Sequence, residues 1–131
     1  MIALIISDIH DQREKLYDVI RRERFDVVFI AGDFTYLGGL DYVIGILKNI
    51  RRRTSAPVYF VPGNCDPYEL LEYSDPGNMI YNVHKRTLSI NNEITIAGIG
   101  GSLPTPFNTS IEFTEEEYNR IIDGAFRDVQ G

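Results

Sequence analysis

Three short, continuous apolar runs most constrain the fold of this 131-residue chain. They lie at residues 2–6, 27–30 and 58–61, and none of them alternates with polar residues. We expect each to be a fully buried strand, because such runs are typical of parallel sheets covered on both faces. Residues 12–24 and 38–50 carry apolar side chains at helical spacing. This strand–helix alternation predicts an α/β domain with parallel strands and right-handed crossovers.

The pattern changes after the third run. Residues 67–73 predict one short helix, and a turn cluster follows it. Residues 83–90 and 93–99 predict two strands, which Asn91 and Asn92 would join in a tight hairpin. The loop after the second of these strands is rich in glycine and proline, so it is neither helix nor central strand.

Thr114 and Glu117 have the spacing of a capping box, which predicts the start of a final helix. Its apolar stripe comprises Ile121, Ile122, Ala125 and Phe126. No linker interrupts the chain, and its length suffices for one ordinary hydrophobic core. We therefore expect residues 1–131 to form a single domain.

Composition and charge narrow the class of protein. The chain is 44% hydrophobic and 24% charged, which is typical of a globular protein. The first apolar run is short and has no positive charge before it, so we expect no signal peptide and a cytoplasmic location. The single cysteine, Cys65, excludes an intrachain disulfide and fits a reducing compartment.

The net charge of −6 argues against tight, non-specific binding of nucleic acid. Two basic clusters, at residues 21–24 and 51–53, interrupt this acidic balance. Both fall where predicted helices end, and positive charge is favourable there. We favour this helix-end interpretation over a phosphate-binding patch.

Polar side chains follow each of the three apolar runs. Asp8 and His10 follow the first run, Asp33 the second, and Asn64 and Asp66 the third. The carboxyl ends of parallel strands meet at one edge of a sheet, where open α/β sheets bind their ligands. Carboxylate, imidazole and amide donors suit Mn, Fe, Zn or Mg better than copper or an all-thiolate zinc site. The sequence therefore predicts a metal site at this edge.

Two other interpretations stay open at this point. Each polar residue alone could be a cap or a turn residue, with Asp8 or Asp11 capping the first helix. The joint occurrence at three strand ends favours the metal site over that interpretation. A nucleotide-binding domain of Rossmann type is disfavoured, because no Gly-x-Gly-x-x-Gly follows the first run.

Three motifs resemble, in order and spacing, those of the calcineurin-like metallophosphoesterases. They are Asp8-Ile9-His10, Gly32-Asp33 with Gly38 five residues on, and Gly63-Asn64-Cys65-Asp66. Cys65 and the later loop at 100–107 are similar to a small bacterial and archaeal phosphodiesterase branch of that family. The resemblance covers essentially the whole chain. It implies a metallophosphoesterase-type α/β sheet flanked by helices, without the C-terminal half of the usual four-layer αββα sandwich.

The resemblance also implies a site for two divalent metal ions, with manganese favoured. Asp8 and His10 would hold the first ion, Asp33 would bridge both, and Asn64 would hold the second through its amide oxygen. Such a pair activates a shared water and clamps the phosphoryl oxygens in the transition state. The implied substrate is a phosphoester, and the implied activity is that of a metal-dependent phosphodiesterase.

Cys65 and Asp66 are the catalytic residues that the resemblance implies. Cys65 stands where most of the family carries a histidine that stabilises or protonates the leaving group. A thiol is a poorer proton donor to an alkoxide of high pKa, so we expect a preference for diesters with good leaving groups. Asp66 would orient residue 65. In the interpretation that stays open, Cys65 is a small, half-buried residue beside the site.

The resemblance leads us to expect further ligands that this chain does not offer. The family supplies histidines from its C-terminal half, including a Gly-His-x-His pair, whereas the one other histidine here is His84. His84 matches no ligand motif, and we expect it to be structural. We also expect an under-coordinated second ion, and weak or absent activity of the chain alone.

Three arrangements would follow from such an incomplete site. The chain would be a fragment or the product of a split gene whose partner supplies the histidines, it would assemble with itself, or the fold would serve binding alone. The last is a non-catalytic scaffold module with a vestigial metal site, as in the retromer subunit that resembles this family. An uncovered apolar face favours association, so we expect a homodimer or higher oligomer.

Overall fold

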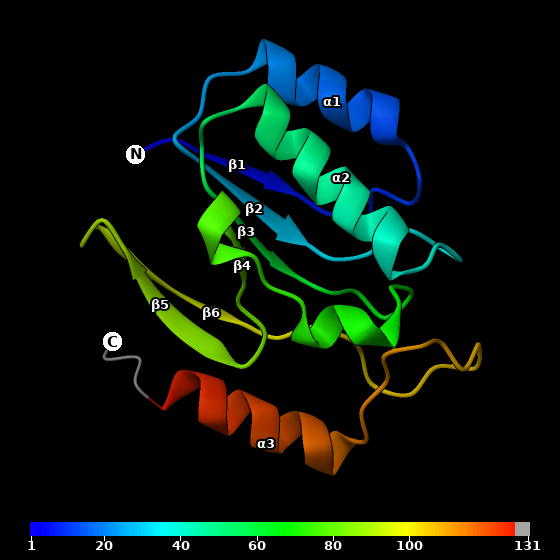
Figure 1. The fold of residues 1–131 in the computed structure, drawn as a ribbon. Coiled ribbons are helices and arrows are strands. Elements are labelled where there is room, and N and C mark those ends of the chain that lie inside the picture. The colour runs from blue at the N-terminus through cyan, green and yellow to red at the C-terminus, as the bar shows by residue number, and fades with distance from the viewer. Residues whose placement is uncertain (128–131) are drawn as a thin grey trace.

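A computed structural model describes residues 1–127 and confirms the α/β class. Four parallel strands form the main sheet in the spatial order β1-β2-β3-β4. Their bounds are Ala3–Ile6 for β1, Val27–Ala31 for β2, Val58–Val61 for β3 and Ile80–Asn82 for β4. Sequential strands are neighbours, and the loops that follow the first three strands lie at one edge, as the sequence predicted (Figure 1).

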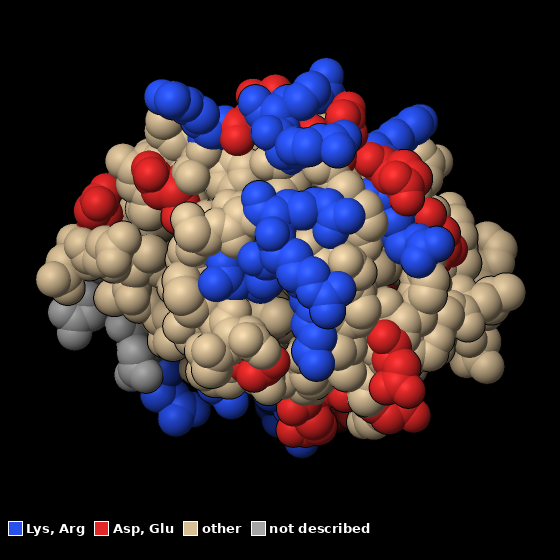
Figure 2. All heavy atoms as spheres, turned by 45° about the horizontal axis from the view of Figure 1, so that its top comes forward, with Lys and Arg blue, Asp and Glu red and all other residues tan. Residues whose placement is uncertain are grey.

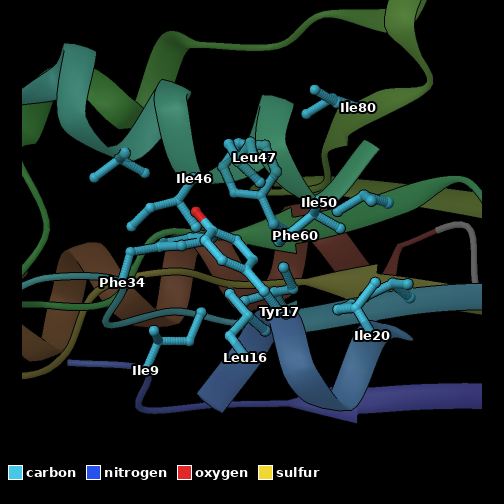
Figure 3. Close-up of a cluster of buried hydrophobic side chains, with 14 of the residues drawn as sticks. Ile9, Leu16, Tyr17, Ile20, Phe34, Ile46, Leu47, Ile50, Phe60 and Ile80 are labelled. Carbon is cyan, nitrogen blue, oxygen red and sulfur yellow. The ribbon is translucent and has the colours of Figure 1, made fainter. Parts of the chain in front are cut away.

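Helices α1 (Arg13–Arg22) and α2 (Leu40–Arg53) lie side by side on one face of this sheet (Figure 1). Their apolar stripes confirm the helical spacing that the sequence shows. Between them and the sheet lies the hydrophobic core, which includes Leu16, Ile20, Phe34, Ile46, Leu47, Ile50 and Phe60 (Figure 3). Within residues 1–127, neither these helices nor any other is long and apolar enough to cross a membrane.

The prediction that the first strand is fully buried is wrong. β1 is an edge strand, and the side chain of Ile5 is 72% exposed. Leu4 and Ile6 point the other way and are partly buried against the core. A continuous apolar run shows that the side chains on both faces of a strand are apolar. Whether both faces are buried depends on other elements that cover them.

The sheet face opposite α1 and α2 carries a row of apolar side chains. Ile5, Phe29, Tyr59 and Tyr81 occupy paired positions on the four adjacent strands. The rings of Phe29 and Tyr59 have centroids 5.9 Å apart, and those of Tyr59 and Tyr81 stack at 4.9 Å. The three aromatic residues are only partly buried. Within residues 1–127, this face is therefore an incompletely covered apolar surface.

A hairpin and a third helix lie below this face (Figure 1). Strands β5 (Arg86–Ile90) and β6 (Ile94–Gly98) pair antiparallel, and α3 (Glu115–Phe126) packs against both. The layers are thus the α1/α2 pair, the main sheet, the hairpin and α3. A cavity of about 270 Å³ lies between β2, β3 and β6, so the hairpin covers the main sheet loosely.

The hairpin turn and the last helix begin as the sequence predicted. Asn91 and Asn92 have φ values of 51° and 57°, the left-handed backbone that a tight hairpin of the primed type requires. The loop has three residues, because Glu93 also lies outside the strands. Thr114 and Glu117 form the predicted capping box, in which each side chain accepts a hydrogen bond from the other's backbone N–H.

Strand β4 was not predicted. It is only three residues long and follows two short 3-10 helices, η1 (Tyr68–Glu72) and η2 (Pro76–Asn78). The first of these confirms the short helix predicted over residues 67–73. Asn82 ends β4, and its buried side-chain amide donates to the carbonyl oxygens of Leu70 and Tyr73 at 3.0 and 2.9 Å. These bonds fix the connection between β3 and β4.

Lys and Arg side chains gather on the face that carries α1 and α2 (Figure 2). The predicted basic clusters occupy the last turns of those two helices: Arg21 and Arg22 in α1, and Arg51, Arg52 and Arg53 in α2. Arg51 donates to the carbonyl oxygens of Thr54 and Ala56 at 2.7 and 2.9 Å. The predicted position at helix C-termini, where positive charge and side-chain donors are stabilising, is confirmed.

Candidate metal centre

The loops that follow β1, β2 and β3 meet at the right-hand edge of the main sheet in Figure 1. Backbone hydrogen bonds join the first two of these loops. His10 N–H donates to Asp33 O at 2.9 Å, and Asp11 N–H donates to Phe34 O at 3.0 Å. The pairing of β1 with β2 thus continues beyond the strands, and it holds the side chains of the two loops next to each other.

Asp8, His10 and Asp33 form the candidate metal centre. His10 Nε2 lies 3.4 Å from Asp8 Oδ1 and 3.9 Å from Asp33 Oδ2. One ligand atom of each residue lies within 4.8 Å of the others. An imidazole nitrogen facing two carboxylate oxygens at this separation fits a divalent cation such as Mn, Fe or Zn. The residues present therefore fit the metal that the sequence predicted.

All three residues have left-handed backbone conformations. The φ angles are 54° for Asp8, 44° for His10 and 53° for Asp33. Non-glycine residues rarely adopt this region, and each such residue costs roughly 1–3 kcal/mol. Strain of this kind persists only where the surroundings enforce it, and it concentrates at functional sites. Here the hydrogen bonds between the two loops enforce it.

The His10 ring stacks on Tyr36, with centroids 4.1 Å and planes 16° apart. Its Nδ1 is buried without a hydrogen-bond partner among the described residues, and Nε2 is the nitrogen that faces the carboxylates. Asp11 Oδ2 accepts a hydrogen bond from Tyr36 N–H at 3.3 Å. Helix α1 begins after Gln12 with no side-chain cap, so the interpretation of Asp8 or Asp11 as its cap is wrong.

Asp66 is fully buried and ties two loops together. Its Oδ1 accepts hydrogen bonds from Phe34 N–H and Thr35 N–H at 2.9 and 3.2 Å, and its Oδ2 accepts one from Gly63 N–H at 2.8 Å. Burial raises the pKa of Asp66 to about 6, although these hydrogen bonds act in the opposite direction. All three contacts are with backbone, so Asp66 joins the loop after β2 to the turn after β3.

Two glycines allow these loops to touch. A Cβ on Gly63 would lie 2.1 Å from Asp33 Oδ1, and one on Gly32 would lie 2.5 Å from Gly63 N. Gly32 also has a φ of 76°, which favours glycine. The loop of Asp33 and the turn that follows β3 are therefore in direct backbone contact, with no room for a side chain between them.

Asn64 and Cys65 lie on the turn that contacts Asp33. Cys65 N–H donates to Asp33 Oδ1 at 3.0 Å, so Asp33 presents Oδ2 to His10 and Oδ1 to this turn. The side-chain amide of Asn64 donates through Nδ2 to Thr109 Oγ1 at 3.1 Å. Burial raises the pKa of the Cys65 thiol, and the nearby carboxylates add to this effect.

Glu112 is a residue that sequence reasoning missed. Its carboxylate accepts hydrogen bonds from Thr105 N–H at 3.0 Å, from the Thr105 hydroxyl at 2.6 Å, and from the N–H and hydroxyl of Thr109. The two threonine hydroxyls lower the pKa of Glu112 to about 2, with the backbone donors acting in the same direction. The only sign of this cluster in the sequence was the pair Thr105 and Thr109, in a loop that we had described by its glycines and prolines.

His84 is not among the three grouped ligand residues. It is 8% exposed, and its Nδ1 accepts a hydrogen bond from Gly100 N–H at 2.8 Å. Its ring stacks on Phe113 with centroids 5.9 Å apart. Burial lowers the pKa of His84 to about 4, so the ring is neutral near pH 7. These contacts support the structural role that the sequence predicted.

Comparison with known proteins identifies the family. A family model for calcineurin-like phosphoesterases matches residues 1–126. An uncharacterised protein of Methanocaldococcus jannaschii is 37% identical over 121 residues, which are 90% of this chain and 52% of that protein. The crystal structure of TT1561 from Thermus thermophilus matches with a TM-score of 0.74 at 14% identity, over 97% of this chain and 63% of that one.

The chain therefore belongs to the calcineurin-like phosphoesterase family, as its three motifs predicted. The structural match confirms the fold, a metallophosphoesterase-type sheet flanked by helices and corresponding to the N-terminal part of the family domain. The chain spans about half the length of the curated relative that it matches. The family typically binds divalent metals, and the grouped Asp8, His10 and Asp33 agree with this property.

The contact between the two loops predicts a strong effect of a small substitution. We expect Gly63→Ala to destabilise the protein by about 1–3 kcal/mol, because the new methyl group overlaps Asp33. The matched control is Gly45→Ala in α2, where a Cβ has open space and should stabilise the helix by up to about 1 kcal/mol. Urea denaturation measures both, and an unchanged midpoint for Gly63→Ala would show that the loops are not closely packed.

Proposed function

We propose that this chain carries the catalytic centre of a metal-dependent phosphoesterase that hydrolyses phosphodiesters. The observation that supports this most directly is the grouping of Asp8, His10 and Asp33 within 4.8 Å at the strand edge of a calcineurin-like phosphoesterase. Divalent ions at such a centre supply an acidified water and neutralise charge on phosphoryl oxygens. Manganese is the metal we favour from the family resemblance, and the mixed oxygen and nitrogen donors suit it, as they also suit iron, zinc or magnesium.

Each ligand has a separate role in this proposal. Asp8 and His10 would hold the first ion, and Asp33 would bridge the two ions through its carboxylate. Asp33 Oδ2 lies 3.9 Å from His10 Nε2, and Oδ1 accepts from the N–H of Cys65, the residue after Asn64, which supports this bridging role. Asn64 would hold the second ion through Oδ1, because its other side-chain atom, Nδ2, donates to Thr109.

Cys65 and Asp66 complete the proposed machinery. Cys65 follows Asn64, and its N–H donates to Asp33 Oδ1. In this proposal its thiol would donate a proton to the leaving group. A thiol serves leaving groups of low basicity best, which favours activated diesters over simple monoesters. Asp66 holds the turn in place through its hydrogen bond with Gly63 N–H.

The ligand set of the second ion is completed, in this proposal, by another polypeptide. Among residues 1–127 we assign to this ion only Asn64 and the shared Asp33, and a tight dimetal site needs more ligands. The exposed side chain of Ile5 and the partly buried Tyr59 and Tyr81 support a covering layer on the main sheet. A second copy of the chain is one candidate for it. A scaffold module that binds a partner on this face, without metal, is the alternative function.

Removing one carboxylate tests the enzyme against the scaffold module. We expect Asp33→Asn to weaken Mn²⁺ binding by about tenfold or more and to abolish hydrolysis of bis(p-nitrophenyl) phosphate, because the bridging charge is lost. Isothermal titration calorimetry and product absorbance measure these effects. Asp41→Asn, in the exposed first turn of α2, is the matched control and should behave as wild type. A folded wild-type chain that takes up no Mn²⁺ would favour the scaffold module.

Substitution of Cys65 tests the choice of substrate. We expect Cys65→His to raise the rate more for alkyl diesters than for p-nitrophenyl diesters, because imidazolium protonates a basic leaving group more readily. Cys65→Ala should slow both classes of substrate. Steady-state rates on a series of leaving groups measure this. Equal rates for the wild type, Cys65→Ala and Cys65→His on every substrate would leave Cys65 with a packing role only.

The incompletely covered face of the main sheet predicts self-association of the isolated chain. At micromolar concentration, sedimentation velocity should show a dimer or larger species, and Ile5→Lys should shift it toward monomer. Leu37→Lys is the matched control, because Leu37 is 97% exposed on the loop after β2 and lies outside the apolar row. A monodisperse wild-type monomer would contradict the proposal of a second copy.

A further inference from the structure

An asparagine binds a cation with only one end of its side chain. Its amide presents a carbonyl oxygen and an NH₂ group of nearly the same size, and only the oxygen is a metal ligand. A rotation of 180° about the last side-chain bond would present the NH₂ group in its place. Asn64 therefore needs a partner that distinguishes the two ends of its amide.

The hydrogen bonds of Thr109 make this distinction. The Glu112 carboxylate is a pure acceptor, and the hydroxyl of Thr109 donates its single proton to Glu112 Oε2. That hydroxyl has no second proton, so toward Asn64 it can only accept. It accepts from Asn64 Nδ2 at 3.1 Å, which identifies this end of the amide as the nitrogen and leaves Oδ1 at the other end.

We call the chain of hydrogen bonds from Asn64 through Thr109 to Glu112 the relay. Backbone hydrogen bonds around it hold it in place. Ile111 N–H donates to Asn64 O at 3.1 Å, and Ser102 N–H donates to Ile111 O at 3.1 Å. The side chain of Ile111 is fully buried. Glu112 follows directly in the chain, and Thr105 donates to it twice from the far side of the loop. Glu112 therefore keeps a fixed distance from Asn64.

We propose that Thr109 and Glu112 are positioning residues that hold the Asn64 amide with its oxygen directed to the metal site. The loop after β6 thereby determines the metal affinity of a residue at the end of β3. The inference rests on the proposed function for the role of Asn64 as a ligand. The orientation of the amide itself does not depend on a bound metal.

Substitutions of Thr109 and Glu112 test the relay with Mn²⁺ as the probe. Thr109→Val keeps the shape and removes the hydroxyl, and we expect it to weaken Mn²⁺ binding by about tenfold. Thr109→Ser restores the hydroxyl and should bring the affinity back to within about twofold of wild type. Glu112→Gln should act like Thr109→Val, because an amide can donate to the hydroxyl and reverse the relay. Thr95→Val, the same change at an exposed position of β6 outside this loop, is the matched control.

The Asn64→Asp background distinguishes an effect on the orientation of the Asn64 amide from a general loss of structure in Thr109→Val. A carboxylate has two equivalent oxygens and no preferred end, so Thr109→Val should weaken Mn²⁺ binding in the wild type but not in the Asn64→Asp background. An equal loss in both backgrounds would overturn the relay. Thr109→Ser binding as weakly as Thr109→Val would also overturn it.

A measurement without metal distinguishes failure of the relay from failure of the proposed function. The ¹⁵N-resolved side-chain NH₂ resonances of Asn64 should shift in Thr109→Val and stay close to wild type in Thr109→Ser. Unchanged resonances in Thr109→Val would overturn the relay. Absence of Mn²⁺ binding that depends on Asp33 would overturn the proposed function, while these resonances would still decide the orientation of Asn64.

Discussion

The buried carboxylate of Asp66 is the interaction on which the rest of the candidate site depends. An ionised carboxylate that leaves water costs several kcal/mol unless hydrogen bonds replace its hydration. Here three backbone N–H groups do so, two from the loop after β2 and one from the turn after β3. The pKa of about 6 shows that burial still outweighs these bonds. Because one side chain joins both loops, neither loop can shift without leaving a buried polar group unpaired.

This constraint explains why a strained backbone is stable at the site. Asp33 lies between Gly32 and Phe34, and Asp66 holds the N–H of Phe34 while Gly63 packs against the Asp33 carboxylate. The left-handed conformation of Asp33 is therefore enforced from both sides. His10 depends on it in turn, because its own N–H is bonded to the carbonyl of Asp33. Contacts with neighbouring loops offset the backbone strain at these positions. The strained backbone conformation in turn determines the directions of the side chains.

Local signals in the sequence were enough to predict the parallel strands and the residues at their ends. Continuous apolar runs bounded by turns mark strands, and Asp8, Asp33 and Asn64 follow such runs directly. Strand β4 gave no such signal, because it becomes a strand only by pairing Ile80 with Val58. The exposure of Ile5 was missed for a related reason, since burial depends on what covers a face and not on the residue itself. Tertiary contact decided both cases.

The contribution of Glu112 to the site could not be predicted, since its neighbour Thr109 meets Asn64 only in the folded chain. Thr109 and Asn64 are 45 residues apart in sequence. Thr109 lies in the loop after the hairpin, whereas Asn64 follows a strand of the parallel sheet. The candidate site is therefore built by both halves of the chain.

The carboxylates of the candidate site also determine its charge. In the proposed enzyme, Asp8 and Asp33 are the carboxylates at the metals, because these two, and not Asp66 or Glu112, are grouped with His10. Two carboxylates do not neutralise two divalent ions, so the excess positive charge favours an anionic substrate such as a phosphodiester.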